Sequence, residues 1–222
     1  MPRAVFALMT LLFFVALALY SGTWWMRAYI AQKDREAQAA HEQLVESHPL
    51  FYRDWIEQYA GKYGLQPALV AAIIRNESSF DPRAESGIGA RGLMQLMEKT
   101  ADWINSQYLH ESGYSFARMW DPECNIRFGC WYLSYLSKLF GGDPVSVIAA
   151  YHAGQGTVRD SWLTNPAISP DGRTLAVDAL PEGQTKNYAK RVTRDYGIYD
   201  TLVFHAFNRP DAGADSDLGA AR

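Results

Sequence analysis

A run of 23 uncharged residues near the N-terminus, Ala4–Met26, constrains this chain more than any other feature. As an α-helix rising about 1.5 Å per residue, it is long enough to span a hydrocarbon core about 30 Å thick. The run is either an uncleaved membrane anchor or a signal peptide cleaved at an Ala-x-Ala motif, Ala16 and Ala18. It continues beyond that motif, and Trp24 and Trp25 precede a basic residue, as in an interfacial aromatic belt. The sequence therefore favours an anchor, residues 1–26.

The charges that flank the apolar run do not orient it. Arg27, Lys33 and Arg35 on its C-terminal side outnumber Arg3 on the other side, contrary to a simple cytoplasmic N-terminus. Residues 27–50 are rich in Ala, Gln, Glu and Lys and contain few large apolar side chains. They are predicted to form a solvated juxtamembrane helix or linker.

The remainder of the chain divides into a folded domain and a tail. Residues 51–206 are long enough for one sizeable hydrophobic core. Residues 207–222 are small, polar and rich in Gly, Ala and Asp, which predicts a disordered tail. Over all 222 residues, 21 basic and 24 acidic side chains give a net charge of -3. No global field attracts a polyanion, so a nucleic-acid partner is not expected.

The two cysteines, Cys124 and Cys130, follow Asp121-Pro122, which is typical of an N-cap and the first residue of a helix. Both thiols then fall on one helix, with Cα atoms roughly 10 Å apart, which is beyond the reach of a disulfide. Two buried free thiols are predicted. No histidine or second cysteine pair stands at the spacing of a zinc site, so no metal is expected.

Helical periodicity predicts helices over residues 51–64 and 66–78, the second beginning at Pro67. The apolar stripe of the second helix consists of Val70, Ile73 and Ile74. The next position in the same i, i+3, i+4, i+7 series is Glu77. A carboxylate is therefore projected onto the buried face at the end of a helix.

Two interpretations of Glu77 are open. Buried glutamates are usually paired, and Arg75, Arg83 or Arg91 could supply a structural ion pair. Alternatively, desolvation keeps the carboxyl of Glu77 protonated near neutral pH, as in a glycosidase acid whose pKa reaches about 6. The residues that follow favour the second interpretation.

A glycine-rich turn follows Glu77, with Gly87, Gly89 and Gly92 placed where backbone could approach a ligand closely. Gln95 supplies a neutral amide, a group suited to reading sugar hydroxyls and acetamides. The turn is predicted to lead directly into an amphipathic helix whose apolar positions are Leu93, Leu96, Met97 and Ile104.

Four motifs in order resemble the soluble lytic transglycosylase (SLT) family, a branch of the goose-lysozyme-like superfamily, over about residues 63–192. These are Glu77-Ser78, the Gly-Leu-Met-Gln block at 92–95, the Ala-Tyr-His-Ala-Gly block at 150–154, and residues 184–192. The resemblance implies a mainly α, lysozyme-like α+β fold, with about seven helices around a glycan cleft and at most a short hairpin. With the N-terminal transmembrane helix, this is the expected architecture.

The resemblance also implies roles for individual residues. Glu77 corresponds to the catalytic acid. The residues expected to line the cleft and contact substrate are Ser78, Met94, Gln95, Tyr151, His152 and Tyr188. Of these, the two tyrosines are expected to approach Glu77.

Two positions depart from the family pattern. His152 stands where the family has Asn, and Gln184 stands where it has Glu. His152 either hydrogen-bonds in the cleft and titrates near neutral pH, or is a helix C-terminal residue bonded to backbone carbonyls. Gln184 removes a charge from the neighbourhood of the acid. Residues 165–183 carry a turn signal and are expected to form a small hairpin or flap over the cleft.

The activity that the resemblance implies is murein lytic transglycosylation by a single acid/base, with no cofactor. A hydrolytic muramidase, a catalytically silent peptidoglycan-binding module and a helical adaptor are the alternatives. The expected partners are peptidoglycan glycan strands, the inner membrane and a secretion or conjugation apparatus. Since murein lies outside the inner membrane, a single pass with a periplasmic domain is expected.

Overall fold

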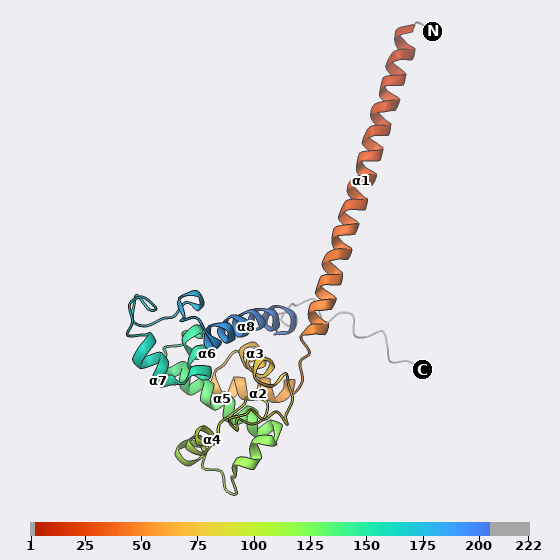
Figure 1. The fold of residues 1–222 in the computed structure, drawn as a ribbon. Coiled ribbons are helices and arrows are strands. Elements are labelled where there is room, and N and C mark those ends of the chain that lie inside the picture. The colour runs from red at the N-terminus through yellow and green to blue at the C-terminus, as the bar shows by residue number, and fades with distance from the viewer. Residues whose placement is uncertain (1–2, 205–222) are drawn as a thin grey trace, which may run out of the picture. The chain divides into compact units, whose positions relative to one another are not determined.

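The computed structural model describes residues 3–204, which form two compact units divided between residues 49 and 50 (Figure 1). The α-helices are α1 (Arg3–Ser47), α2 (Arg53–Tyr63), α3 (Pro67–Ser78), α4 (Glu98–Ile104), α5 (Pro122–Leu139), α6 (Pro144–Ala153), α7 (Gln155–Thr157) and α8 (Gln184–Tyr199). Short 3-10 helices span Phe116–Trp120 and Val177–Ala179, and π-helical turns span Asn105–Leu109, Val158–Trp162 and Asp200–Phe204.

The first unit is one continuous helix. α1 joins the apolar run and the polar segment predicted as a separate juxtamembrane element, and its described side chains are almost all exposed. Polar side chains one turn apart support its C-terminal half, as in the ion pair of Lys33 with Glu36 at 2.8 Å. Among the described residues, one helix, α1, is both long enough and apolar enough to cross a membrane.

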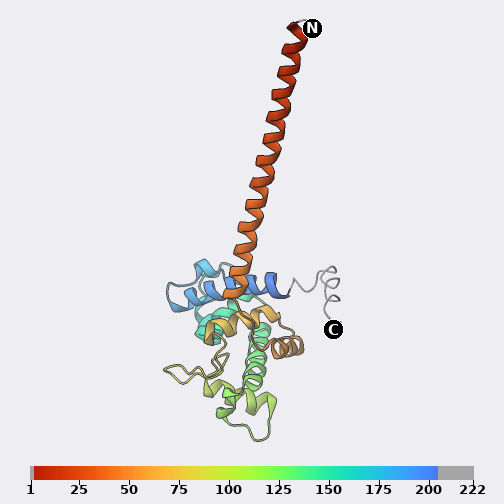
Figure 2. The same ribbon diagram turned by 90° about the vertical axis from the view of Figure 1, so that its right-hand side faces the viewer.

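The second unit is built around α5, which runs through its middle (Figure 2). α5 begins where the sequence predicts, because Asp121 accepts a hydrogen bond from the Cys124 N–H at 2.8 Å and Pro122 occupies the first helical position. α6 begins in the same way, with the Asp143 carboxylate capping the N–H of Ser146 at 2.9 Å. Both cysteines are free and buried on α5, as predicted.

α3 and α8 lie side by side and carry the site (Figures 1 and 2). α3 buries the predicted stripe completely and contacts α2 as well as α8, and α6 also packs on α8. A second, smaller apolar cluster packs α4 and the Phe116–Trp120 turn against α5. The mainly α class is thus confirmed, with seven α-helices, α2–α8, in the described part of this unit.

The predicted helix through Leu93 and Leu96 is wrong in its first half. Residues 91–96 form tight turns with isolated bridges, and α4 begins only at Glu98. Gly92 has a φ of 75°, and a Cβ there would meet the Met119 carbonyl and the Asn125 amide. This glycine therefore permits a close approach within the protein rather than to a ligand.

The expected hairpin over residues 165–183 does not form, since the described residues contain only turns and isolated β-bridges outside their helices. Asp171 organises this stretch instead. Its carboxylate accepts hydrogen bonds from the backbone of Arg173 and Thr174 and from the Thr174 hydroxyl, which hold its pKa well below the usual range. Local polar bonds of this kind replace a strand ladder. The predicted tail, residues 207–222, lies outside the described residues, as does the predicted domain end at 206.

Candidate active site

Glu77 lies in the last turn of α3, where the apolar stripe predicts it. The backbone turns sharply after it, because Ser79 and Phe80 both adopt left-handed φ values of 52° and 66°. The hydroxyl of Tyr188, from α8, donates a 2.6 Å hydrogen bond to Glu77 Oε1. Tyr188 is itself 2% exposed, so the bond is made in a nearly dry setting.

Burial sets the protonation of this carboxyl. Desolvation raises the pKa of Glu77 from 4.5 to about 7, while the Tyr188 hydrogen bond and the charge of Arg191 lower it by smaller amounts. Two of the three arginines proposed as ion-pair partners are paired with other carboxylates: Arg75 lies 3.4 Å from Asp195, and Arg91 lies 3.0 Å from Glu85. A carboxyl that is half protonated near neutral pH can both give and take a proton.

A set of hydrogen bonds to the 91–95 turn fixes the residues around Glu77. The Ser78 hydroxyl lies 2.8 Å from the Leu93 carbonyl, and the Tyr151 hydroxyl donates to the Met94 carbonyl at 2.7 Å. Met94 is fully buried, so its side chain packs in the core rather than on the cleft surface. Tyr151 does not bond Glu77 directly; burial, and to a smaller extent the charge of Glu77, raise the pKa of its phenol.

The turn itself is held by Asn125, which sequence reasoning missed. This side chain is 0% exposed. Its Oδ1 accepts from the Met94 N–H at 2.8 Å, and its Nδ2 donates to the Arg91 and Met119 carbonyls at 2.9 and 3.0 Å. A signal existed in the sequence, since Asn125 shares one helical face with Phe128 and Gly129 at i+3 and i+4.

Gln95 also contributes to the turn. It adopts a left-handed φ of 46°, and its Nε2 donates to the carbonyls of Ala84 and Gly92 at 2.8 and 3.0 Å. Its amide nitrogen is therefore bonded to the protein, and contact with substrate through this residue stays a prediction.

His152 is connected to Glu77 through Tyr188. Its ring centroid is 4.6 Å from that of Tyr188, and its Nδ1 is 3.0 Å from the Thr185 hydroxyl. Partial burial, and then the charge of Arg191, lower its pKa. The side chain thus bonds a hydroxyl of α8 rather than backbone carbonyls of its own helix. Gln184, the other departure from the pattern, is the exposed first residue of α8.

A cavity of about 280 Å³ lies near this group, lined by Lys99, Thr100, Trp103, Tyr132 and Gln155. Tyr132 connects it to the site, because its ring centroid is 5.6 Å from that of Tyr151. Neither the cavity nor its lining was foreseen from the sequence. Its aromatic and polar walls suit a carbohydrate ligand.

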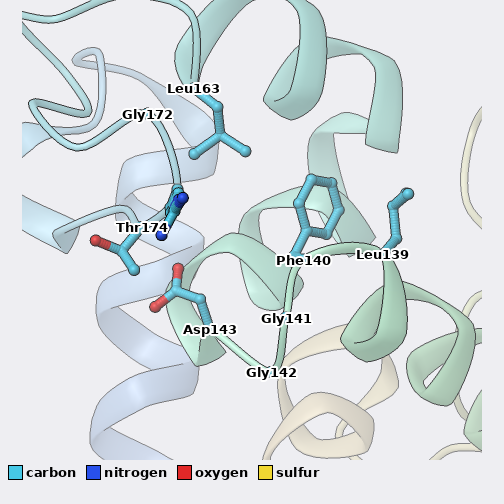
Figure 3. Close-up of a pocket in the computed structure, with 9 residues that line it drawn as sticks. Leu139, Phe140, Gly141, Gly142, Asp143, Leu163, Gly172 and Thr174 are labelled. Atoms are coloured by element: carbon cyan, nitrogen blue, oxygen red, sulfur yellow. The ribbon is translucent and has the colours of Figure 1, made fainter.

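A second cavity, of about 560 Å³, lies at the opposite end of α6 from Tyr151 (Figure 3). Leu163, Phe140 and Leu139 form its apolar side, and Asp143 faces it from the N-terminus of the helix. The Asp143 carboxylate already accepts hydrogen bonds from Ser146 and Leu175. Since no member of the Glu77 group lines this cavity, it is separate from the candidate active site.

Comparison with known families decides the classification. The model of the transglycosylase SLT domain matches residues 54–169, more than half of the chain and nearly all of the elements that build the site. The chain belongs to the SLT transglycosylase family. The matched range contains the first three motifs, and α8, which supplies Tyr188, lies beyond it.

Individual SLT proteins are similar over only part of their length. The chain is 34% identical to the soluble lytic murein transglycosylase of Escherichia coli over 176 residues, 78% of this chain and 26% of that protein. It is 37% identical to the membrane-bound lytic murein transglycosylase C of Yersinia enterocolitica over 158 residues, 64% and 44% of the two chains. The structure of an inactive glutamate-to-glutamine mutant of the Pseudomonas aeruginosa lytic transglycosylase Slt superposes with a TM-score of 0.63 at 34% identity, over 72% of this chain and 25% of that one. The chain thus spans about a quarter of the soluble relatives it matches.

Proposed function

We propose that this chain is a membrane-anchored lytic transglycosylase that cleaves the β-1,4 bond between N-acetylmuramic acid and N-acetylglucosamine in murein. The observation that carries the proposal is the carboxyl of Glu77, hydrogen-bonded by a buried tyrosine and with a pKa raised to about 7. Similarity to soluble and membrane-bound murein transglycosylases supports the substrate class. The inactive glutamine mutant of a structural relative supports a glutamate as the essential group.

One carboxyl suffices for the proposed reaction. The Tyr188 hydroxyl donates its hydrogen bond to Oε1 of Glu77, so the proton of the acid is on Oε2. Oε2 gives this proton to the bridging oxygen as the bond between that oxygen and C1 breaks. The 2-acetamido group of the substrate stabilises the cation from the opposite face. The ionised Glu77 then takes the proton of the muramic 6-hydroxyl, whose oxygen bonds to C1 and closes a 1,6-anhydro ring.

The proposed location follows from the substrate. Murein lies outside the inner membrane, so α1 crosses that membrane once, with its N-terminus cytoplasmic and the SLT domain periplasmic. α1 offers the apolar length that this requires. A secretion or conjugation apparatus that crosses the wall is the proposed partner, because a small tethered SLT domain suits local opening of murein.

Mass spectrometry of murein fragments tests the reaction. The full chain in detergent should release fragments 18 Da lighter than hydrolytic products, the mass of the water that is not added. Hydrated reducing ends would instead identify a muramidase. A folded chain that binds murein without releasing fragments would identify the silent binding module.

A pH profile tests the role assigned to Tyr188. Since the reaction starts from protonated Glu77, the rate should fall as the pH rises through about 7. The hydrogen bond from Tyr188 lowers the pKa of Glu77, so Tyr188→Phe should move this alkaline limb to higher pH. A hydrogen bond to a charged group is worth about 1.5–3 kcal/mol, which predicts a rate loss of roughly 10- to 100-fold. Tyr196→Phe, on the same helix but away from Glu77, is the control. An unshifted limb in Tyr188→Phe would refute the assignment.

A further inference from the structure

The residue that precedes Glu77, Asn76, links the last turn of α3 to α8. Its Nδ2 donates hydrogen bonds to the Ala72 carbonyl and to Asp195 Oδ2, each at 2.9 Å. A carbonyl and an ionised carboxylate can only accept, so these two bonds fix the orientation of the amide and leave Oδ1 for a donor. That donor is Arg191 of α8, whose Nε lies 3.2 Å from Asn76 Oδ1.

Asp195 is the buried end of this link. The residue is 2% exposed. Besides Asn76, its carboxylate contacts Arg75 Nε at 3.4 Å and Arg194 Nη2 at 2.8 Å. A buried carboxylate is tolerated only where it is paired and hydrogen-bonded, so these partners on α3 and α8 fix its place. The position of Asn76 is therefore set by a group inside the fold.

Arg191 is the exposed end of the link, and it brings a positive charge toward the acid. It follows Tyr188 by three residues and so shares its face of α8, and the Tyr188 hydroxyl lies 2.6 Å from Glu77 Oε1. A long exposed side chain has many rotamers when nothing holds it. The hydrogen bond to Asn76 holds the guanidinium at the C-terminal end of α3, where the peptide dipoles leave a partial negative charge.

Near neutral pH, Arg191 supplies the positive charge of this group. The other titratable side chains around Glu77 and its tyrosine partner come from α6 and α8, and are Tyr151, His152 and Tyr188. Burial is the largest cause that raises the pKa of both tyrosines, and also the largest that lowers the pKa of His152. These three side chains are therefore neutral above the usual pKa of histidine, whereas an arginine stays charged.

We propose that Asn76 and Asp195 are positioning residues for the reaction: they hold the Arg191 guanidinium at the end of α3, where its charge stabilises the carboxylate that Glu77 becomes on protonating the bridging oxygen. Burial opposes that ionisation, and the partial negative charge at the helix end opposes it further. A fixed cation offsets both effects without contacting the substrate. The inference rests on Glu77 being the acid of the proposed function.

The pH profile of murein cleavage by the full chain tests the inference. Arg191→Gln should move the alkaline limb to higher pH by about 0.2–0.7 units, the range for a partly exposed charge pair, whereas Arg191→Lys keeps the charge and should leave the limb in place. Asn76→Ala should move the limb in the same direction as Arg191→Gln, and the double variant should move it no further than Arg191→Gln alone. Arg159→Gln, which removes an exposed arginine paired with Asp160, is the matched control and should leave the limb in place.

Urea unfolding measures the same pKa without catalysis. The stability gain of Glu77→Gln over the parent chain levels off at the pH where the folded carboxyl ionises. This pH should rise by the same amount when both chains carry Arg191→Gln.

The two measurements separate the outcomes. An unmoved limb with an unmoved unfolding profile in Arg191→Gln would overturn the inference, as would a raised KM with an unmoved limb, which would make Arg191 a substrate contact. Additive shifts in the double variant would mean that Asn76 does not act through Arg191, and would also overturn it. If the unmutated chain releases no murein fragments but the unfolding profile moves as expected, the proposed enzymatic function fails while the placement of the charge beside Glu77 stands.

Discussion

Glu77→Gln should reduce glycan cleavage by about 10²- to 10⁴-fold, the usual contribution of a general acid/base, while the chain remains folded and binds murein. Glutamine has nearly the shape of glutamic acid and keeps a carbonyl oxygen to accept the hydrogen bond from Tyr188. It has no proton to transfer near neutral pH. Turnover of murein by equal amounts of folded protein is the measurement. A variant that kept most of its activity would refute the assignment of Glu77.

The same substitution should stabilise the protein at neutral pH. The pKa of Glu77 rises from 4.5 in the unfolded chain to about 7 in the folded one. Below pH 4.5 the carboxyl is protonated in both states and costs nothing. Between pH 4.5 and 7 this carboxyl ionises only in the unfolded chain. The free energy of unfolding therefore falls by about 1.4 kcal/mol per pH unit, and the total loss levels off near 3 kcal/mol. Glutamine does not titrate, so Glu77→Gln should gain this amount above pH 7.

Urea unfolding as a function of pH distinguishes this effect from a general one. Glu57→Gln is the matched control, because Glu57 is an exposed residue of α2 that pairs with Arg53 at 2.7 Å. A surface pair contributes about 0–1 kcal/mol, so this variant should show little pH-dependent change. A stability difference for Glu77→Gln that is flat from pH 4 to 8 would contradict the raised pKa. Loss of activity together with the pH-dependent gain in the free energy of unfolding would show that Glu77 serves activity while lowering stability.

The location of Glu77 could be predicted from the sequence because a helix has a fixed period. The stripe of Val70, Ile73 and Ile74 is buried as expected, and Glu77, which continues it, is partly buried and bonded by Tyr188. The raised pKa follows from burial alone. Its partner on α8, Tyr188, is 111 residues away, and no local pattern pairs two such positions. Only the family motifs placed Tyr188 near the acid.

The glycine-rich segment shows why the rest could not be predicted. Leu93 and Leu96 have helical spacing, yet Gln95 is left-handed and the chain turns back on itself. The competing force is tertiary: Asn125, 31 residues away, takes the Met94 N–H that a helix would use. The same bond explains why Met94, expected at the cleft surface, is in the core. The helical propensity of this short segment is overridden by one buried side chain, Asn125, which has three hydrogen-bond partners.

Asn125→Leu should therefore have the largest effect on stability. Leucine has a similar size but leaves the Met94 N–H without its partner and removes the amide donor from the Met119 and Arg91 carbonyls, of which the Arg91 carbonyl still accepts from the Leu96 N–H. Each unpaired buried group costs about 1–3 kcal/mol, partly offset by the added apolar surface, so a loss of about 3–5 kcal/mol is expected. Urea unfolding measures it. Asn187→Leu, at an exposed position of α8, should stay within about 0.5 kcal/mol of the unmutated chain.

Asn125→Asp separates lost hydrogen bonding from lost packing. The carboxylate oxygen can still accept from the Met94 N–H, but the second oxygen replaces an amide that donated to two carbonyls. When protonated, that oxygen can donate to one of them, and when ionised to neither. Stability of Asn125→Asp should thus fall as the pH rises above about 4, whereas that of Asn125→Leu should differ from the unmutated chain by an amount that does not change with pH, because leucine does not titrate. A pH-independent loss in both variants would mean that Asn125 acts by filling space. The activity of either variant, measured where it is still folded, should also fall, because Leu93 and Met94 carry the carbonyls that hold Ser78 and Tyr151.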